Sequence, residues 1–278
     1  MIDFDLDDHL LGKISSENSV IFSGAGTSTQ NSIISQYTLY QIICNDLSVE
    51  KHLPFPDLCQ IYLDKPDGKY RLVKKIQERL DYVNKFSDLR TAATQFHIEL
   101  STMPYFNTFV TTNWDRYFEN ICKAKPFVYD SDLRFWELPS RRVLKIHGTI
   151  DDYSSIVATR EDYTKCAKRL QTSLMGGKLK EILSTKTCIF IGYSMKDDDF
   201  REIFQFVKEA QGQFRKSHYI VSPFIDNNLP FDDLIPIKTD GTFFLKTIKD
   251  HMRNSFDFLP DSVFALAQEE LFYVLGHL

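Results

Sequence analysis

The segment SVIFSGAGTS, residues 19–28, decides the fold class. A strand-forming run is followed at once by Gly24, Ala25 and Gly26. Such a turn lets the backbone approach a phosphate, and a following helix start offers free N–H groups. The alternative is a tight strand-to-helix turn that binds nothing. The dinucleotide fingerprint needs a third Gly or Ala where Thr29 stands, so an ordinary dehydrogenase is a poor match.

Short apolar runs outside this segment predict the rest of a sheet. Several are continuous, as expected for strands that are covered on both faces of a parallel sheet. The sequence therefore predicts an α/β fold, a Rossmann-like parallel sheet flanked by helices. The further strands are expected at Thr108–Thr111, Val143–Ile146, Thr187–Ile191, His218–Val221 and Ile235–Lys238.

The long connection between the first two strands has helical periodicity. Leu72, Val73, Ile76, Leu80 and Val83 form an amphipathic stripe, which indicates a helix over residues 68–86, and residues 87–100 indicate a second. We expect one domain over residues 1–278 with a helical insertion at about 48–102. Further helices are expected at 197–210, at 242–253 and, at the C-terminus, at about 260–277.

Composition excludes several classes of protein. The 278 residues are 43% hydrophobic and 26% charged, which is ordinary for a globular chain. A net charge of −5 argues against direct nucleic-acid binding. Five cysteines without a C-x-x-C pair argue against a disulfide framework and a zinc ribbon. The N-terminus MIDFDLDDHL is not a secretory signal, and no apolar stretch is long enough to span a membrane, so we expect a cytoplasmic protein.

Three more polar motifs follow predicted strands. Thr112-Asn113-Trp114-Asp115 could simply cap a helix, and His147 before Gly148 could be a satisfied structural histidine. Gly192-Tyr193-Ser194 could be a plain turn. Ligands of open α/β sheets bind beyond the carboxyl ends of the strands, so these motifs and the glycine loop would meet at one edge.

The order GAGTS, TTNWD, KIHG and IGYS resembles the sirtuin-like family, in particular the sirtuin-like NAD hydrolases of bacterial anti-phage defence systems. The resemblance spans roughly residues 19–240. It implies a sirtuin-like fold that hydrolyses NAD, as substrate, to ADP-ribose and nicotinamide. It also implies an NAD-depleting effector that is activated by assembly as a homo-oligomer or by a separate partner such as an ATPase or sensor.

The resemblance also implies roles for individual residues. Asn113 would orient the nicotinamide ribose or the attacking water, Asp115 would help to bind nicotinamide or its ribose, and His147 would be the general base. These residue types suit the reaction, because a neutral amide does not trap the positive charge that develops on the sugar and a histidine accepts a proton at neutral pH. The implied cofactor-binding residues are Gly24, Ala25, Gly26, Thr27, Ser28, Thr112, Gly192, Tyr193 and Ser194.

The chain departs from protein-deacylating sirtuins in two ways. It has no paired cysteines for their zinc module, and the region TQNSIISQYTLY lacks their Gly-Ile-Pro and Phe-Arg segment. These departures favour water as the acceptor, and we expect no metal. Two alternatives remain, an NAD-dependent protein deacylase and a non-catalytic module that binds NAD or ADP-ribose. No loop indicates a site for a 2′-phosphate, so the choice between NAD and NADP stays open.

Overall fold

A seven-stranded parallel sheet forms the centre of the computed structural model, which describes residues 6–29, 31, 34, 38–49, 52–192, 198–212, 216–224 and 234–255. The strand order is β3-β4-β2-β1-β5-β6-β7. The strands are β1 (Ser19–Ser23), β2 (Thr108–Thr111), β3 (Lys125–Phe127), β4 (Arg142–Lys145), β5 (Thr187–Ile191), β6 (His218–Val221) and β7 (Leu234–Ile237).

The chain reverses its direction across the sheet at β1. From β1 it moves to β2 and then to the edge strand β3, places β4 between those two, and returns to place β5 on the other side of β1. The parallel register pairs Ser23 with Thr111 on one side and with Ile191 on the other. The segments that follow β1, β2 and β5 therefore emerge side by side, and such a switch point is where open α/β sheets bind ligands.

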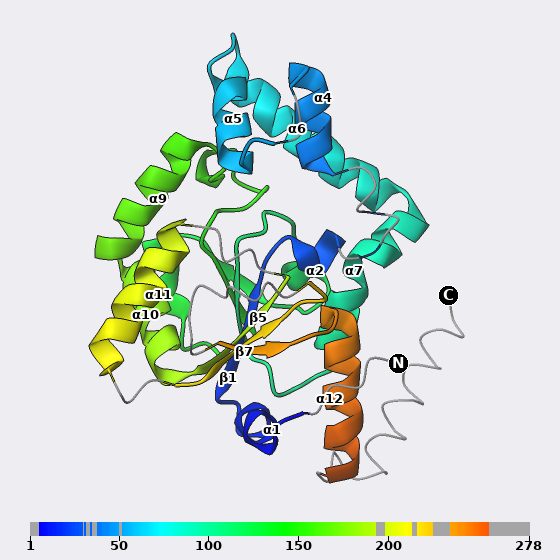
Figure 1. Cartoon of the computed structure of the whole chain (residues 1–278), viewed down its shortest axis with the longest axis vertical. Helices are drawn as coiled ribbons and strands as arrows, with labels where there is room; N and C mark the ends of the chain where they lie inside the picture. The colour runs from blue at the N-terminus through cyan, green and yellow to red at the C-terminus, as the bar shows by residue number, and fades with distance from the viewer. Residues whose placement is uncertain are drawn as a thin grey trace.

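Helices cover both faces of the sheet (Figure 1). On one face, a core around Val20, Phe22 and Phe190 packs against α9 (Arg160–Thr172), α10 (Leu174–Thr185) and α11 (Asp198–Gln211). On the other face, a core around Ile21 and Phe109 packs against α1 (Asp8–Ser15), α7 (Ser87–Ser101) and α12 (Gly241–Ser255). Alternate residues of β1 thus enter opposite cores, as the pleat of a strand requires.

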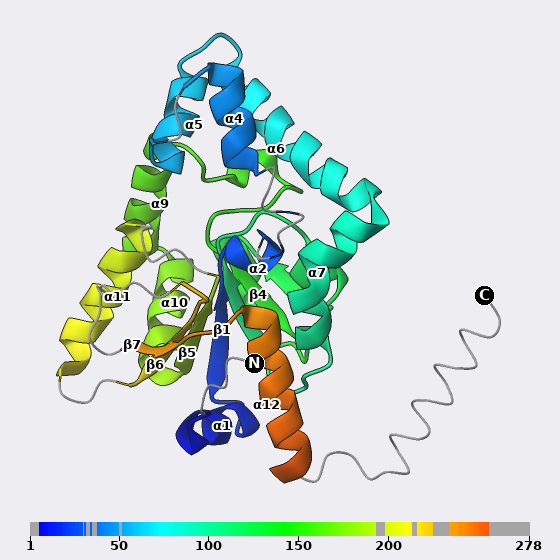
Figure 2. The same cartoon turned by 45° about the vertical axis from the view of Figure 1, so that its right-hand side comes forward.

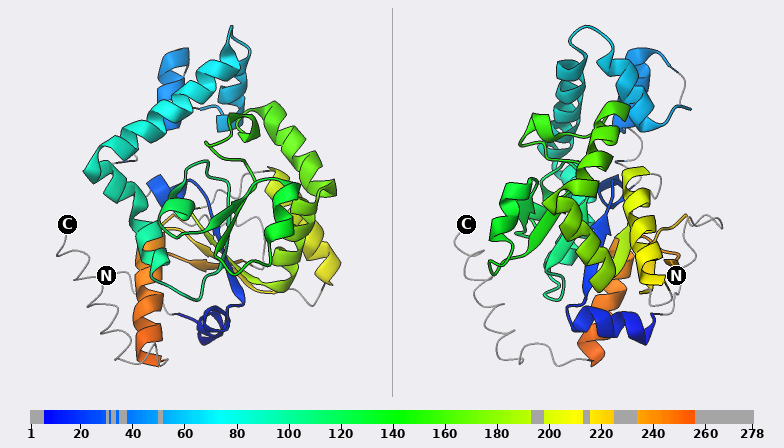
Figure 3. Two further views of the ribbon diagram at one scale, coloured as in Figure 1. Left: turned by 180° about the vertical axis from the view of Figure 1, so that it is seen from behind. Right: turned by 90° about the vertical axis from the view of Figure 1, so that its left-hand side faces the viewer.

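A group of helices rises beyond the carboxyl edge of the sheet, at the top of Figures 1 and 2. It consists of α4 (Leu39–Leu47), α5 (Phe55–Leu63) and α6 (Gly68–Lys85), and α7 returns from it to the sheet. A third core joins these helices, with Trp114 packed against it. Figure 3 shows that the group stands above the strand ends and reaches across to α9. Two ion pairs make that link, Lys69 with Asp162 at 3.2 Å and Arg160 with Asp57 at 2.5 Å.

Short elements complete the described chain. They are α2 (Gly26–Thr29), α8 (Tyr117–Asn120) and two 3-10 turns, η1 (Asp130–Phe135) and η2 (Tyr153–Ser155). Among the described residues, no helix is long and apolar enough to cross a membrane.

The predicted fold class is confirmed, and four of the predicted strands have the expected bounds. Two strands begin and end one residue earlier than predicted, at Arg142–Lys145 and Leu234–Ile237. The sequence analysis missed β3, α1, α9 and α10. That residues 1–278 form one domain stays a prediction, and the expected helix at 260–277 lies outside the described residues.

Candidate functional site

A cavity of about 1340 Å³ opens at the carboxyl edge of the sheet, between the strand ends, the helical group and α9. Residues from the segments after β1, β2, β4 and β5 line its floor. The helical residues Ile76, Leu80 and Val83 on α6 give it an apolar wall, and α9 supplies a facing wall with Tyr163 and Gln171. The floor residues are Ala25, Gly26, Ser28, Thr29, Thr112, Asn113, Trp114, Asp115, His147 and Gly192.

The loops after β1 and β5 touch each other through two glycines. A Cβ on Gly26 would lie 2.6 Å from the Cα of Gly192. A Cβ on Gly192, whose φ is +58°, would lie 2.4 Å from the backbone nitrogen of Thr27. No side chain fits at either position, because real Cβ contacts are never so short. Backbone packing therefore requires both glycines, whether or not a phosphate binds.

Four backbone donors of the glycine loop already have protein acceptors. Gly24 donates to the carbonyl of Ile191 at 3.1 Å, and Gly26 donates to the carbonyl of Gly192 at 2.9 Å. Thr27 and Ser28 donate to carbonyls within the loop itself. The expectation of free N–H groups at this helix start is therefore wrong for these four residues. A phosphate could not use these four N–H groups without a change in the loop.

Thr27 holds the loop from inside. It is 1% exposed, and its hydroxyl donates to the carbonyl of Gly24 at 2.9 Å and lies 2.8 Å from the hydroxyl of Ser23. Neither Thr27 nor Gly24 lines the cavity. Thr27 therefore maintains the shape of the turn that presents Ala25 and Ser28 to the cavity.

Asn113 joins the loop after β2 to the glycine loop. Its backbone N–H donates to the Thr111 hydroxyl at 3.0 Å, and its side-chain Nδ2 donates to the carbonyl of Gly24 at 3.1 Å. Only 9% of the residue is exposed, and it lines the cavity. Its amide is thus fixed through one N–H, and the structure gives its amide oxygen no partner among the described residues.

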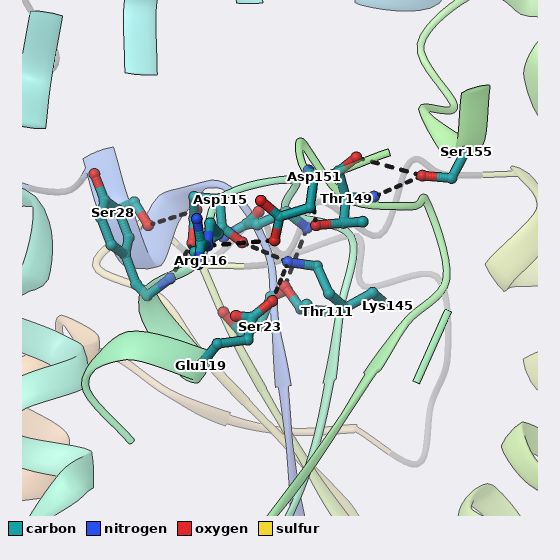
Figure 4. A network of polar contacts seen from close by, with 12 residues as sticks. Ser23, Ser28, Thr111, Asp115, Arg116, Glu119, Lys145, Thr149, Asp151 and Ser155 are labelled. Carbon is teal, nitrogen blue, oxygen red and sulfur yellow. Dashed lines mark hydrogen bonds and ion pairs between the residues drawn. The ribbon is translucent and has the colours of Figure 1, made fainter. Parts of the chain in front are cut away.

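Asp115 lies two residues further along the same loop (Figure 4). One carboxylate oxygen accepts from the N–H of Tyr117 at 3.0 Å and the other lies 3.5 Å from the hydroxyl of Ser28. Burial raises the pKa of the Asp115 carboxyl, while the nearby ammonium of Lys145 opposes that rise. The carboxyl group is therefore held in place at the cavity floor in a poorly solvated setting.

His147 follows β4 and is 2% exposed. Its ring lies edge-on to Tyr163 of α9, with ring centroids 4.9 Å apart. The carbonyl of His147 accepts from the N–H of Val157 at 3.0 Å. Packing from α9 and backbone pairing together fix the imidazole at the cavity.

Most of the predicted site residues meet at this one cavity. Ala25, Gly26, Ser28, Thr112, Asn113, Asp115, His147 and Gly192 line it, whereas Gly24 and Thr27 stand behind it. Tyr193 and Ser194 lie outside the described residues. The chemical roles of all these residues stay predictions.

The sequence analysis missed two aromatic residues of the cavity. Trp114 lies between Asn113 and Asp115 and packs near Phe55 of α5, with ring centroids 6.2 Å apart. Tyr163 stands against His147. Trp114 is inside the quoted TTNWD motif and could have been included, but Tyr163 lies on a helix that the sequence analysis did not predict.

A metal site does not emerge from the described part of the chain, where no group of three or more His, Cys, Asp or Glu side chains converges. All five cysteines are free and buried.

The central part of the chain matches the model of a known protein family. The SIR2-like domain family matches residues 107–235. The central part of the chain is therefore similar to this family. The match contains Asn113, Asp115, His147 and Gly192, and the glycine loop of residues 24–28 precedes it.

Curated relatives of this chain include proteins named NAD(+) hydrolase ThsA. The protein from Cytobacillus dafuensis is 27% identical over 245 residues, which cover 85% of this chain and 47% of the relative. The protein from Bacillus cereus (strain MSX-D12) is 27% identical over 215 residues, 74% of this chain and 43% of the relative. The chain therefore spans about half the length of the curated relatives it matches.

Solved structures that resemble this chain include Sir2 homologues. A Sir2 homolog–NAD complex is 14% identical, with a TM-score of 0.46, covering 90% of this chain and 95% of that chain. A Sir2 homologue bound to ADP-ribose is 12% identical, with a TM-score of 0.46, covering 92% and 100%.

Proposed function

We propose that this chain hydrolyses NAD to ADP-ribose and nicotinamide. The observation that carries the proposal is the convergence of Asn113, Asp115 and His147 on one cavity at the switch point of the sheet. The name of the curated relatives, NAD(+) hydrolase, supports the same reaction. A non-catalytic NAD-binding module would need none of the three side chains.

The reaction breaks the bond between the ribose C1′ and the nicotinamide nitrogen. The electron pair of that bond goes to nicotinamide, which leaves as a neutral molecule, and positive charge develops on the sugar. A water oxygen then forms a bond to C1′, and its proton passes to a ring nitrogen of His147. Acid–base groups of this kind typically contribute about 10²–10⁴-fold.

Asn113 and Asp115 would position the reactants. Since one amide N–H of Asn113 is held by the carbonyl of Gly24, the amide plane is fixed before substrate arrives. Its oxygen and second N–H would then orient the ribose or the water. The Asp115 carboxyl, tethered through Tyr117, would bind nicotinamide or its ribose.

The test is product analysis after incubation of NAD with purified protein. We expect ADP-ribose and nicotinamide from the wild type, and losses of about 10²-fold or more in Asn113→Ala and His147→Ala. Lys165→Met is the matched control, because it removes an exposed ion pair with Glu161 on the outer side of α9. Full activity in both site variants would overturn the assignment, and release of O-acetyl-ADP-ribose when an acetylated peptide is added would indicate a deacylase.

We propose further that the protein is an NAD-depleting effector of anti-phage defence that acts in the cytoplasm and is activated by homo-oligomer assembly or by a partner protein. The resemblance of its motifs to the sirtuin-like defence hydrolases supports this role. Light scattering coupled to size exclusion, with NAD cleavage measured across the protein concentration, tests assembly. Activity per protomer that does not change with concentration would argue against activation by self-assembly.

A further inference from the structure

Beneath the cavity floor lies a lysine that no proposed step uses. Lys145 is the last residue of β4, and it pairs in register with Thr111 at the end of β2. Its residue is 0% exposed. Burying an unpaired ammonium is costly, so the contacts of this side chain must compensate for its lost hydration.

Lys145 makes those contacts to the segment that follows β2. Its ammonium donates to the backbone carbonyl of Asp115 and to the Glu119 carboxylate, whose Oε1 is 2.9 Å away. In Figure 4 the nitrogen of the Lys145 side chain points toward Asp115 and Glu119. Lys145 thus holds the main chain at Asp115, whose side chain lies at the cavity, and we call this contact the clamp.

The buried Lys145–Glu119 ion pair contributes little to the free energy of unfolding compared with apolar side chains at the same positions. The other carboxylate oxygen of Glu119, Oε2, is buried and has no hydrogen-bond partner within the described residues. Replacing both members of a buried pair by apolar residues is often neutral or stabilising, whereas removing one member is strongly destabilising. Stability therefore gives little reason for the pair, and its contact with Asp115 gives a better one.

The clamp bears directly on the geometry of the site. The Asp115 carbonyl is held by Lys145, and the Asp115 carboxylate is held by the N–H of Tyr117 and approached by Ser28. On the other side of the same loop, Asn113 is held by Thr111 and Gly24. Lys145 supplies the only ammonium or guanidinium contact to the Asp115 carbonyl among the described residues.

We propose that Lys145 and Glu119 form a positioning pair, which fixes the Asn113–Asp115 loop in the geometry needed for NAD cleavage. This proposal rests on the proposed function for its catalytic part. The claim about the loop itself can be tested without NAD.

The experiment compares Lys145→Met with the double variant Lys145→Met/Glu119→Met, using Lys165→Met as the control. The single variant leaves Glu119 buried without its cation and should unfold at lower urea. The double variant removes both charges and should recover most of that stability. In both, hydrogen exchange of the peptide spanning residues 112–118 should become about tenfold faster, because the clamp is lost.

The kinetic readout separates positioning from stability. In the stable double variant we expect kcat for NAD to remain about 10²-fold below wild type, since a displaced reacting group costs about that much. The KM should change far less, because the other walls of the cavity are untouched. If kcat returns together with stability, the pair is only structural and the proposal is overturned.

Failure of the proposed function would look different. A wild-type protein that neither binds nor cleaves NAD would refute NAD hydrolysis, while faster exchange at residues 112–118 in the double variant would still support the clamp. Unchanged exchange there, at equal free energy of unfolding, would overturn the clamp whatever the enzyme does.

Discussion

His97 makes the stability of this protein depend on pH in a predictable direction. The residue lies on α7, is 0% exposed, and neither ring nitrogen has a hydrogen-bond partner within the described chain. The rings of Phe96, Tyr117 and Phe118 surround it, at centroid distances of 4.8–5.4 Å. Burial, with a smaller effect of the Lys145 charge, lowers the pKa of His97 from 6.5 to about 3.

The size of the effect follows from the difference between the two states. Between pH 6.5 and about 3 the unfolded chain binds a proton at His97 that the folded chain does not, so acidification favours unfolding. At about 1.36 kcal/mol per pH unit, moving from pH 7 to pH 5 costs about 2 kcal/mol of stability. The loss grows to about 4 kcal/mol near pH 3. The loss of stability at pH 5 is the same for any pKa of His97 below about 4 in the folded protein.

Urea denaturation of wild type and His97→Phe at pH 7 and pH 5 measures this term. The variant keeps an aromatic ring in the cluster but cannot titrate, so the difference between the two proteins isolates His97 from carboxyl groups such as Glu119, whose pKa is raised by burial. We expect the difference in free energy of unfolding to change by about 2 kcal/mol in favour of the variant at pH 5. The same change in His251→Gln, an exposed histidine on α12, would point to a general charge effect. A difference that stays constant between the two pH values would refute the reasoning.

Three further predictions concern stability. Gly26→Ala should lower the free energy of unfolding in urea by about 1–3 kcal/mol, because its Cβ would meet Gly192. Gly177→Ala on α10 should raise it by about 0.5–1 kcal/mol, because nothing lies within 4 Å of the added Cβ. Equal effects of the two substitutions would contradict the contact between the loops. Phe190→Ala should cost about 3–5 kcal/mol because the ring is fully buried in the central sheet, and a loss below about 1 kcal/mol would place it outside the core. Arg160→Ala breaks the ion pair with Asp57, in which the arginine side chain is 68% exposed, so the loss of stability measured by thermal unfolding should be less than about 1 kcal/mol. A larger loss would mean that the ion pair is needed to hold α5 against α9.

The sequence predicts the interior strands well because burial on both faces leaves a simple pattern. SVIFS and TCIFI are continuous runs, and every residue of β1 and β5 is buried. The edge strand β3 escaped prediction because it has only three residues, contains Pro126, and exposes two of its positions. Helix α9 escaped because only Cys166 and Leu170 are fully buried along it, so its apolar stripe is thin.

The sequence motifs predict which residues gather at the site, but not which side chains and backbone groups contact one another there. Strand ends of a parallel sheet must share one edge, so Asn113 and His147 were expected near the glycine loop. The pairing of Lys145 with Glu119 depends on the direction of side chains across a separation of 26 residues, which no local pattern records. Likewise, nothing in the order of residues indicates that four N–H groups of the glycine loop already have acceptors.

The contact between Gly26 and Gly192 has a consequence for how related sequences are compared. Each glycine makes room for the other's backbone, so the two positions are expected to show epistasis, with a larger residue at one tolerated only after a rearrangement at the other. A descendant that lost all enzymatic activity would still retain both glycines to keep its fold. Glycine motifs alone therefore cannot distinguish active enzymes from inactive paralogues. The presence of both Asn113 and His147 would be the more informative criterion for activity.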